Sequence, residues 1–186
     1  MMPVVSLLSK RATVNPPDAN SLCLECGLCC NGVIFADGQL QAGDDATRLQ
    51  SLGLAFVGVK AGIQKFKQPC TAFAGCQCKI YSERPKYCRE FECLLLKSVK
   101  SGQTDRSAAS RIVRSALQRV KKVKRLLQEL GDSEEGLALS KRFRRMKRKL
   151  EIGPRDEDSA EKFGELTLAV HDLNMLLAEA FYPRPQ

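Results

Sequence analysis

The chain has 186 residues, 44% of them hydrophobic, and its 30 lysines and arginines outnumber 21 acidic residues to give a formal net charge of +9. This composition suits one compact domain, or a small domain with a helical extension, and it excludes bulk disorder. The sequence contains no run of about 18 apolar residues, the length needed to span a bilayer. Residues 1–11 also lack the positive start and apolar stretch of a secretory signal. We therefore expect a cytoplasmic protein that does not enter a membrane.

The first part of the chain alternates turn residues with short apolar runs. Glycine, proline and asparagine mark the turns, and short runs rich in valine, isoleucine and phenylalanine indicate strands. An aspartate before a helix can cap its first turn. The predicted elements here are a loose lead-in (1–20), an extended segment (33–35), a hairpin turn (36–38), a short helix capped by Asp44 or Asp45 and running through Leu52, and two weak strands (54–59 and 63–66).

A helix is predicted to begin at Pro85, because proline is favoured at the first position of a helix. This helix would carry Cys88 and Cys93 and continue through Leu96. Together with the strands, it gives residues 21–97 an α+β character. We call residues 21–97 the cysteine module.

The character of the sequence changes from Ser98 onward, where apolar residues recur in steps of three and four. Such spacing is typical of amphipathic helices, and we predict helices at 105–130, 134–151 and 158–182. Residues 111–149 hold 14 basic residues against four acidic ones, whereas residues 151–186 hold three against eight. We expect a mainly antiparallel three-helix extension in which basic and acidic helices face one another, or one whose basic faces meet an acidic partner.

All nine cysteines lie between Cys23 and Cys93. In a reducing cytoplasm, dense cysteines are more often metal ligands or catalytic thiols than disulfides. The odd number of cysteines and the adjacent pair Cys29-Cys30 also fit a fully paired disulfide framework poorly. We therefore expect a metal-binding protein, with the cysteines supplying the ligands.

The spacing of the first cysteines is typical of a metal knuckle. In Cys23-x-x-Cys26-Gly27 two sulfur atoms can reach one metal, and the glycine lets the backbone turn beneath them. Adding Cys29 gives a spacing shared with three ligands of bacterial [4Fe–4S] sites. Adjacent side chains diverge, so Cys30 would serve a different centre from Cys29 or stay a free thiol. Eight cysteines suffice for two four-thiolate sites, and one cluster with several reactive thiols is the alternative.

Four cations interleave with the later cysteines. A zinc ion with four thiolates carries a charge of −2, and Arg84 and Arg89, which flank Cys88 and Pro85, are expected to offset such charge. We interpret Lys79 and Lys86 as ordinary surface charges. The only histidine, His171, lies far along the chain beside a helical apolar stripe and is expected to be a surface residue, which excludes Cys2His2 zinc sites.

Several separated motifs in residues 20–97 resemble, in order, the CxxCxxCC family, the zinc- or iron-chelating, YkgJ-like cysteine-cluster domain of bacteria. They are Cys23-x-x-Cys26-Gly27-x-Cys29-Cys30, Pro69-Cys70, Cys78-x-Ile80-Tyr81-x-x-Arg84-Pro85, Cys88-Arg89 and Cys93. The resemblance implies that the metal ligands are Cys23, Cys26, Cys29, Cys30, Cys70, Cys78, Cys88 and Cys93. Cys76 departs from the family pattern, and the resemblance does not cover the helices from Ser98 onward.

Three functions are compatible with these features. The first is a metal-binding module whose zinc or iron is structural or serves metal handling. The second is an iron–sulfur redox protein or a methyltransferase-associated protein, since longer relatives resemble flagellin lysine N-methylases. The third is a metal-stabilised nucleic-acid binder that uses the basic helices. No phosphate loop, dinucleotide fingerprint or cysteine–histidine nucleophile pair is present in the sequence.

Overall fold

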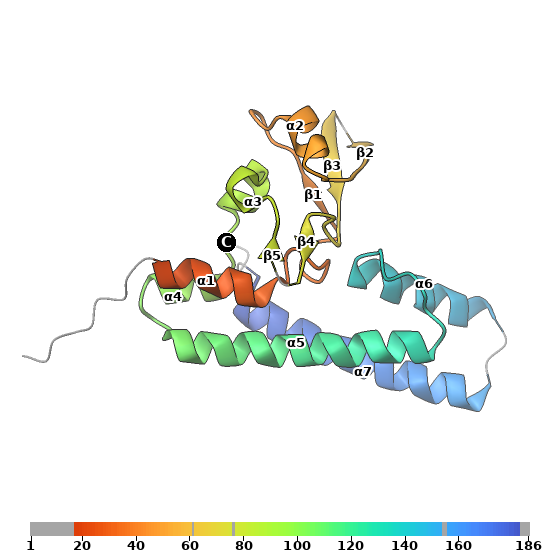
Figure 1. Cartoon of the computed structure of the whole chain (residues 1–186). Coiled ribbons are helices and arrows are strands. Elements are labelled where there is room, and N and C mark those ends of the chain that lie inside the picture. Colours follow the sequence, from red (N-terminus) through yellow and green to blue (C-terminus); the bar gives the residue numbers. More distant parts are fainter. Residues whose placement is uncertain (1–16, 61, 76, 154–155, 183–186) are drawn as a thin grey trace, which may run out of the picture.

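The computed structural model describes residues 17–60, 62–75, 77–153 and 156–182. Two long helices, α5 and α7, lie side by side and form a base, and the strands stand above them with α2 and α3 (Figure 1). The helices and the small antiparallel sheets confirm the predicted α+β class. None of the helices in the described ranges combines the length and the apolarity needed to cross a membrane.

The first helix, α1 (Pro17–Cys26), overturns part of the predicted lead-in, because residues 17–20 are helical rather than turn. Pro17 is compatible with a helix start, since the first helical amide needs no partner within the helix. Leu22 is buried and belongs to the large core that includes α5. Burial of this apolar side chain therefore favours a helix where local composition favours a turn.

The three-stranded antiparallel sheet has the order β1-β3-β2. Its strands are β1 (Asp37–Gln39), β2 (Phe56–Lys60) and β3 (Ile63–Lys67). The predicted strands are confirmed in β2 and β3. The extended segment predicted at residues 33–35 forms no strand, since the chain bends at Val33 and Ile34, and the turn predicted at residues 36–38 is wrong, because Asp37 and Gly38 lie in β1. Gly38 pairs with Phe66, and a Cβ atom at Gly38 would lie 2.0 Å from the Phe66 ring. The glycine thus makes room for a buried aromatic ring.

The short helix α2 (Ala46–Ser51) confirms one of the two predicted caps, since the Asp45 side chain accepts a hydrogen bond from Arg48 N. After the sheet come a two-stranded ribbon, β4 (Phe73–Ala74) with β5 (Gln77–Cys78), and a 3-10 turn, η1 (Tyr81–Glu83). These elements are very short. Their placement therefore depends on side-chain contacts more than on backbone pairing.

The single helix predicted from Pro85 is two helices, α3 (Lys86–Glu90) and α4 (Leu94–Lys100). The backbone of Phe91 is extended, and its ring packs edge-to-face on Phe35 with the centroids 4.7 Å apart. Cys93 caps α4, because its sulfur accepts a hydrogen bond from Leu96 N at 3.4 Å. The tertiary contact of Phe91 thus interrupts a run of residues that favours a continuous helix.

The three long helices are α5 (Arg106–Glu129), α6 (Leu139–Ile152) and α7 (Glu157–Ala180). Their presence confirms the three predicted amphipathic helices. Asp156 caps α7, two residues before the predicted start of this helix at residue 158, and its side chain accepts a hydrogen bond from Ser159 N. The basic and acidic helices face one another as expected. The ion pairs between them join Arg119 to Asp172 at 2.8 Å and Lys122 to Glu165 at 3.1 Å.

The buried residues form two clusters of different size. The larger cluster joins α1 and α4 to α5, α6 and α7, and a smaller one under the sheet holds Leu49, Leu54, Phe66, Ala72 and Ile80. The helix α4 crosses the predicted division between residues 97 and 98. The beginning of the cysteine module therefore packs on the helical extension, while its centre has only a small core of its own.

Candidate metal centre

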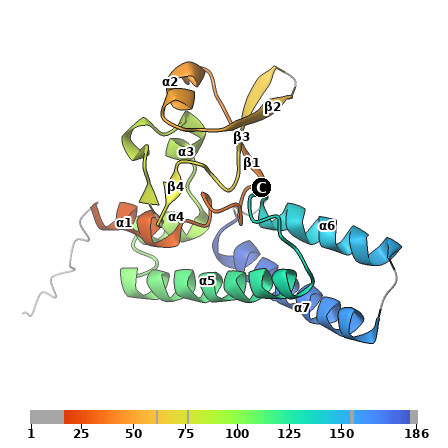
Figure 2. The same ribbon diagram turned by 45° about the vertical axis from the view of Figure 1, so that its right-hand side comes forward.

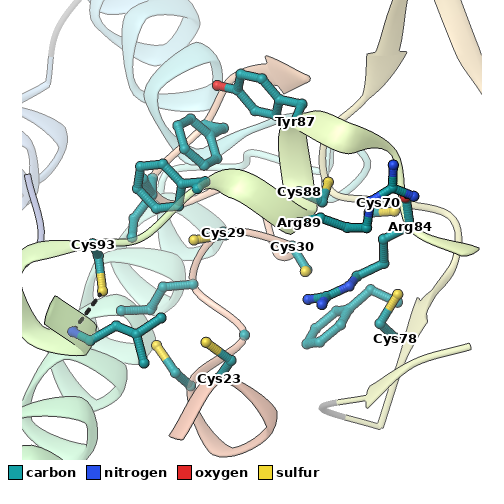
Figure 3. Close-up of a pocket in the computed structure, with 18 of the residues that line it drawn as sticks. Cys23, Cys29, Cys30, Cys70, Cys78, Arg84, Tyr87, Cys88, Arg89 and Cys93 are labelled. Atoms are coloured by element: carbon teal, nitrogen blue, oxygen red, sulfur yellow. Dashed lines mark hydrogen bonds between the residues drawn. The ribbon is translucent and has the colours of Figure 1, made fainter. Parts of the chain in front are cut away.

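The eight cysteines that the structure describes all line one pocket, which has a cavity of about 150 Å³. They come from α1 and the turn after it, the segment between β3 and β4, β5, α3 and the start of α4. Figure 3 shows the sulfur atoms of the labelled cysteines around this pocket. The fold thus brings together all eight cysteines that the family resemblance nominates. Cys76 lies outside the described residues.

One set of four thiols, which we call the first cysteine group, is built at the end of α1. Cys23 and Cys26 lie three residues apart on this helix and therefore share one face. Gly27 then turns the chain with a φ of +61°. Cys93 comes from the start of α4, and Phe181 O accepts a hydrogen bond from Leu94 N at 3.2 Å. The first cysteine group is Cys23, Cys26, Cys29 and Cys93.

We expect Gly27→Ala to lower the free energy of unfolding by about 1–3 kcal/mol, because a non-glycine residue is strained at this positive φ. A Cβ atom there would also lie 2.5 Å from the Phe73 ring. Denaturant unfolding would measure the change. The matched control is Gly164→Ala in α7, where a Cβ meets nothing within 4 Å and helix propensity predicts slight stabilisation. Equal stability of the two variants would contradict this role of Gly27.

The other four thiols, the second cysteine group, are drawn together from three segments. Cys70 N donates a hydrogen bond to Cys30 O at 2.8 Å, so the turn after α1 is tied directly to the segment after β3. Cys78 lies on β5 opposite Phe73. Cys88 lies on α3, one turn after Pro85. The second cysteine group is Cys30, Cys70, Cys78 and Cys88.

The adjacent residues Cys29 and Cys30 belong to different groups. In Figure 3 Cys29 lies on the side of Cys23 and Cys93, and Cys30 lies on the side of Cys70 and Cys78. This arrangement matches the divergence expected of adjacent side chains. The vicinal pair therefore sits at the boundary between two sets of four sulfur atoms.

Burial keeps the thiols of the first group protonated. Burial first, and the neighbouring Cys93 and Cys23 to a smaller extent, raise the pKa of Cys26 to about 12. Burial likewise raises the pKa of Cys29 well above its ordinary value, and the largest electrostatic contribution to this rise comes from Cys26. A buried site loses solvation when it is charged, which is why the neutral thiol is favoured.

In the second group, burial first, and the neighbouring Cys70 and Cys78 to a smaller extent, raise the pKa of Cys30 to about 12. The pKa of Cys88 is also raised to about 12, mainly by burial and next by the neighbouring Cys30. The positive charge of Arg84 opposes both shifts. These thiols are therefore electrostatic neighbours, and Arg84 is the cation that favours their ionised form.

The Arg84 side chain is held in place beside the second group. Its guanidinium lies 3.7 Å from the centre of the Tyr81 ring, and its Nε donates a hydrogen bond to Tyr81 O at 2.9 Å. Arg89 Nη1 donates to Arg84 O at 2.7 Å. Both arginines line the pocket, as Figure 3 shows. Lys79 and Lys86 do not line it.

The donors at the pocket fit a soft metal, since thiolate sulfur binds zinc, copper(I) and iron–sulfur clusters best. The thiols are not closed around a point, because no three Cys, His, Asp or Glu side chains in the described ranges are placed to hold an ion as they stand. Binding would therefore draw the segments together. His171 is exposed on α7, as predicted for a surface residue.

Other pocket residues were not identified from the sequence. The Phe35 ring packs edge-to-face on Tyr87 at 5.3 Å, in addition to its contact with Phe91. Phe181 is buried at the far end of the chain and also lines the pocket. Gln68 is buried there as well, and its Oε1 has no hydrogen-bond partner in the described structure. Phe35, Tyr87 and Phe91 lie among the cysteines in the sequence, and this proximity could have indicated that they line the pocket. Phe181 lies far from the cysteines in the sequence, so no local pattern indicates its place in the pocket.

Comparison with known proteins agrees with the site. The profile of the family CxxCxxCC, described as "putative zinc- or iron-chelating domain", matches residues 22–116. The match includes the eight pocket cysteines and extends into α5. Searches of curated proteins and of solved structures gave no match. Since the matched residues make up more than half of the chain, the protein belongs to the CxxCxxCC family.

Proposed function

We propose that this protein is a metal-binding module in which each four-cysteine group holds its own metal centre, and that these centres stabilise the fold of the cysteine module. The observation that carries the proposal is the arrangement of eight cysteines from distant segments around one pocket, divided into two sets of four. Four protein thiolates leave no open position on a zinc ion, which is typical of structural sites.

The small core of the cysteine module supports a structural role. Among the described residues, its own cluster has five buried hydrophobic side chains under the sheet, and β4 and β5 have two residues each. Small domains with little core usually need disulfides or metals for stability. Metal bound between the turn after α1, the ribbon and α3 would join the segments that backbone pairing holds weakly.

The charge at the pocket also supports four-thiolate binding. Each zinc ion with four thiolates would carry −2, and a buried negative charge needs a cation near it. Arg84 lies beside the second group. Burial raises the pKa of Cys23, and the positive charges of Arg84 and Lys100, which both line the pocket, oppose this rise. When bound, zinc would supply charge neutralisation and cross-linking, and the protein would supply the thiolates and these counter-charges.

Elemental analysis of anaerobically purified protein, combined with a visible absorption spectrum, tests the proposal. We expect about two zinc ions per chain and no colour. An iron–sulfur protein would instead be brown and contain iron with inorganic sulfide. Protein with neither metal, whose fold survives strong chelation unchanged, would contradict the proposal.

A further inference from the structure

One face of α6 is strongly basic and lies outside the metal centre. Lys141, Arg144, Arg145 and Arg148 are spaced three and four residues apart and, with Leu137, line a hollow of about 530 Å³. Residues at this spacing share one side of a helix. The helix lies at the opposite end of the molecule from α1 in both views (Figures 1 and 2).

These charges are only weakly neutralised within the molecule. Arg145 pairs with Glu134 at 2.8 Å, but both side chains are exposed, and such pairs contribute little. Lys141 is 3.9 Å from Asp37, which already pairs with Lys65 at 2.8 Å. Within the described part of the chain, no acidic side chain forms an ion pair with Arg144 or Arg148. The face is therefore available to an external anion.

The other arginine of this helix shows how a structural charge is treated in the same protein. Arg142 is buried, and its Nε donates to Asp132 at 2.6 Å. The exposed cations have no comparable role in the fold. Arg144, Arg145 and Arg148 are exposed, so packing would accept any polar side chain at these positions. This concentration of positive charge therefore points to an anionic partner.

The chemistry of the face favours phosphate over a membrane or single-stranded bases. The apolar residues of α6, among them Met146 and Phe143, pack on the large core, and the Phe143 ring stacks on Phe163 with centroids 6.2 Å apart. A helix that lies in a membrane interface needs a free apolar face. Single-stranded binding normally uses exposed aromatic rings. This face of α6 offers mainly cations.

We propose that the basic face of α6 binds the phosphate backbone of double-stranded nucleic acid. Arginine guanidinium groups match phosphate oxygens with two hydrogen bonds each. The four cations extend along about 10 Å of helix, a length over which a duplex presents several phosphates. Such contacts position a protein on a duplex without reading its sequence. The proposal does not depend on which metal the cysteines bind.

Binding of the metal-loaded full chain to a duplex of mixed sequence, about 20 base pairs long, tests this proposal across a range of salt concentrations. We expect affinity to fall steeply with salt because neutralised phosphates release counterions. In the triple variant, the slope of log affinity against log salt should shrink by about three, with at least about a tenfold loss of affinity at low salt. This variant is Arg144→Gln, Arg145→Gln and Arg148→Gln.

The matched control removes three exposed cations from the outer face of α5, which have no ion pair among the described residues: Arg111→Gln, Arg114→Gln and Lys121→Gln. It makes the same change in net charge, and we expect only a small loss of affinity, by no more than about threefold. Lysine at the three α6 positions should retain most binding, because it keeps the charge.

Three outcomes would overturn the proposal. The first is no binding of the duplex by the wild-type chain at low salt. The second is an equal loss of affinity in the α6 variant and the α5 control, which would mean that net charge alone attracts the duplex. The third is equally tight binding of the wild-type chain to polyglutamate or to phosphatidylserine vesicles, which would assign the face to an acidic protein or a membrane.

Discussion

Replacing Cys26 and Cys29 with serine is expected to remove one of about two bound metal ions per chain, while Cys70→Ser with Cys88→Ser removes the other. Each pair belongs to one cysteine group, so each double variant leaves the opposite group with its full set of thiols. Elemental analysis of purified variants measures the ions retained. Combining all four substitutions should abolish metal binding.

The effect on stability should be large, because a structural metal contributes its binding free energy to folding, about 10–16 kcal/mol in zinc-finger peptides. We expect either double variant to show proteolysis within the cysteine module, while α5 and α7 remain helical through their shared core. The control His171→Ala removes an exposed side chain of α7 and should retain both ions.

Loss of both ions from either double variant, with α5 and α7 still helical, would contradict two independent centres. It would mean that the two groups bind metal only together, either as one polynuclear centre or through the fold that they share. Retention of both ions by either variant would show that the altered cysteines are not ligands.

Loading the metal-free protein with zinc near pH 7.5 should release about eight protons per chain. Burial holds the pKa of Cys26, Cys30 and Cys88 at about 12 in the fold, so these thiols are protonated before metal binds. Only thiolates bind the metal, and each centre must therefore release about four protons. The zinc affinity of each site should therefore rise by up to about four orders of magnitude for each unit of increase in pH, and it should fall by the same factor as the pH decreases.

The stability of the metal-free fold should have the opposite dependence on pH. A thiol whose pKa is raised from its ordinary value of 9.0 to about 12 stays protonated in the fold while the unfolded chain ionises. The unfolded state then binds fewer protons, and stability falls as pH rises. The contribution is thus complete below about pH 9 and lost as pH approaches 12.

Proton release can be measured with a pH indicator in weakly buffered solution, and unfolding of the metal-free chain by denaturant at several pH values. Each double cysteine variant should release about four protons, from its one remaining centre. Release of fewer than about four protons by the wild-type chain would contradict the assignment of buried, protonated thiols as ligands. Increasing stability of the metal-free chain between pH 9 and 12 would contradict the raised pKa values.

Local sequence signals predicted the parts of the fold whose structure depends on near neighbours. The apolar spacing of α5 and α7 and the aspartate cap at Asp45 are such signals. They failed where a distant contact outweighs local preference. Phe91 interrupts the predicted helix and packs on Phe35. Gly38 pairs with Phe66 in the sheet, where the absence of a side chain leaves room for the Phe66 ring.

The sequence by itself determined the kind of donor and the number of cysteines, because thiol chemistry and spacing are properties of the chain. It also determined that Cys29 and Cys30 point apart, since neighbouring side chains diverge on any backbone. Only the tertiary structure decided which distant cysteines meet. The hydrogen bond from Cys70 N to Cys30 O and the contact of Leu94 with Phe181 O create those groupings, and such contacts join residues too far apart in sequence for any periodic pattern to encode.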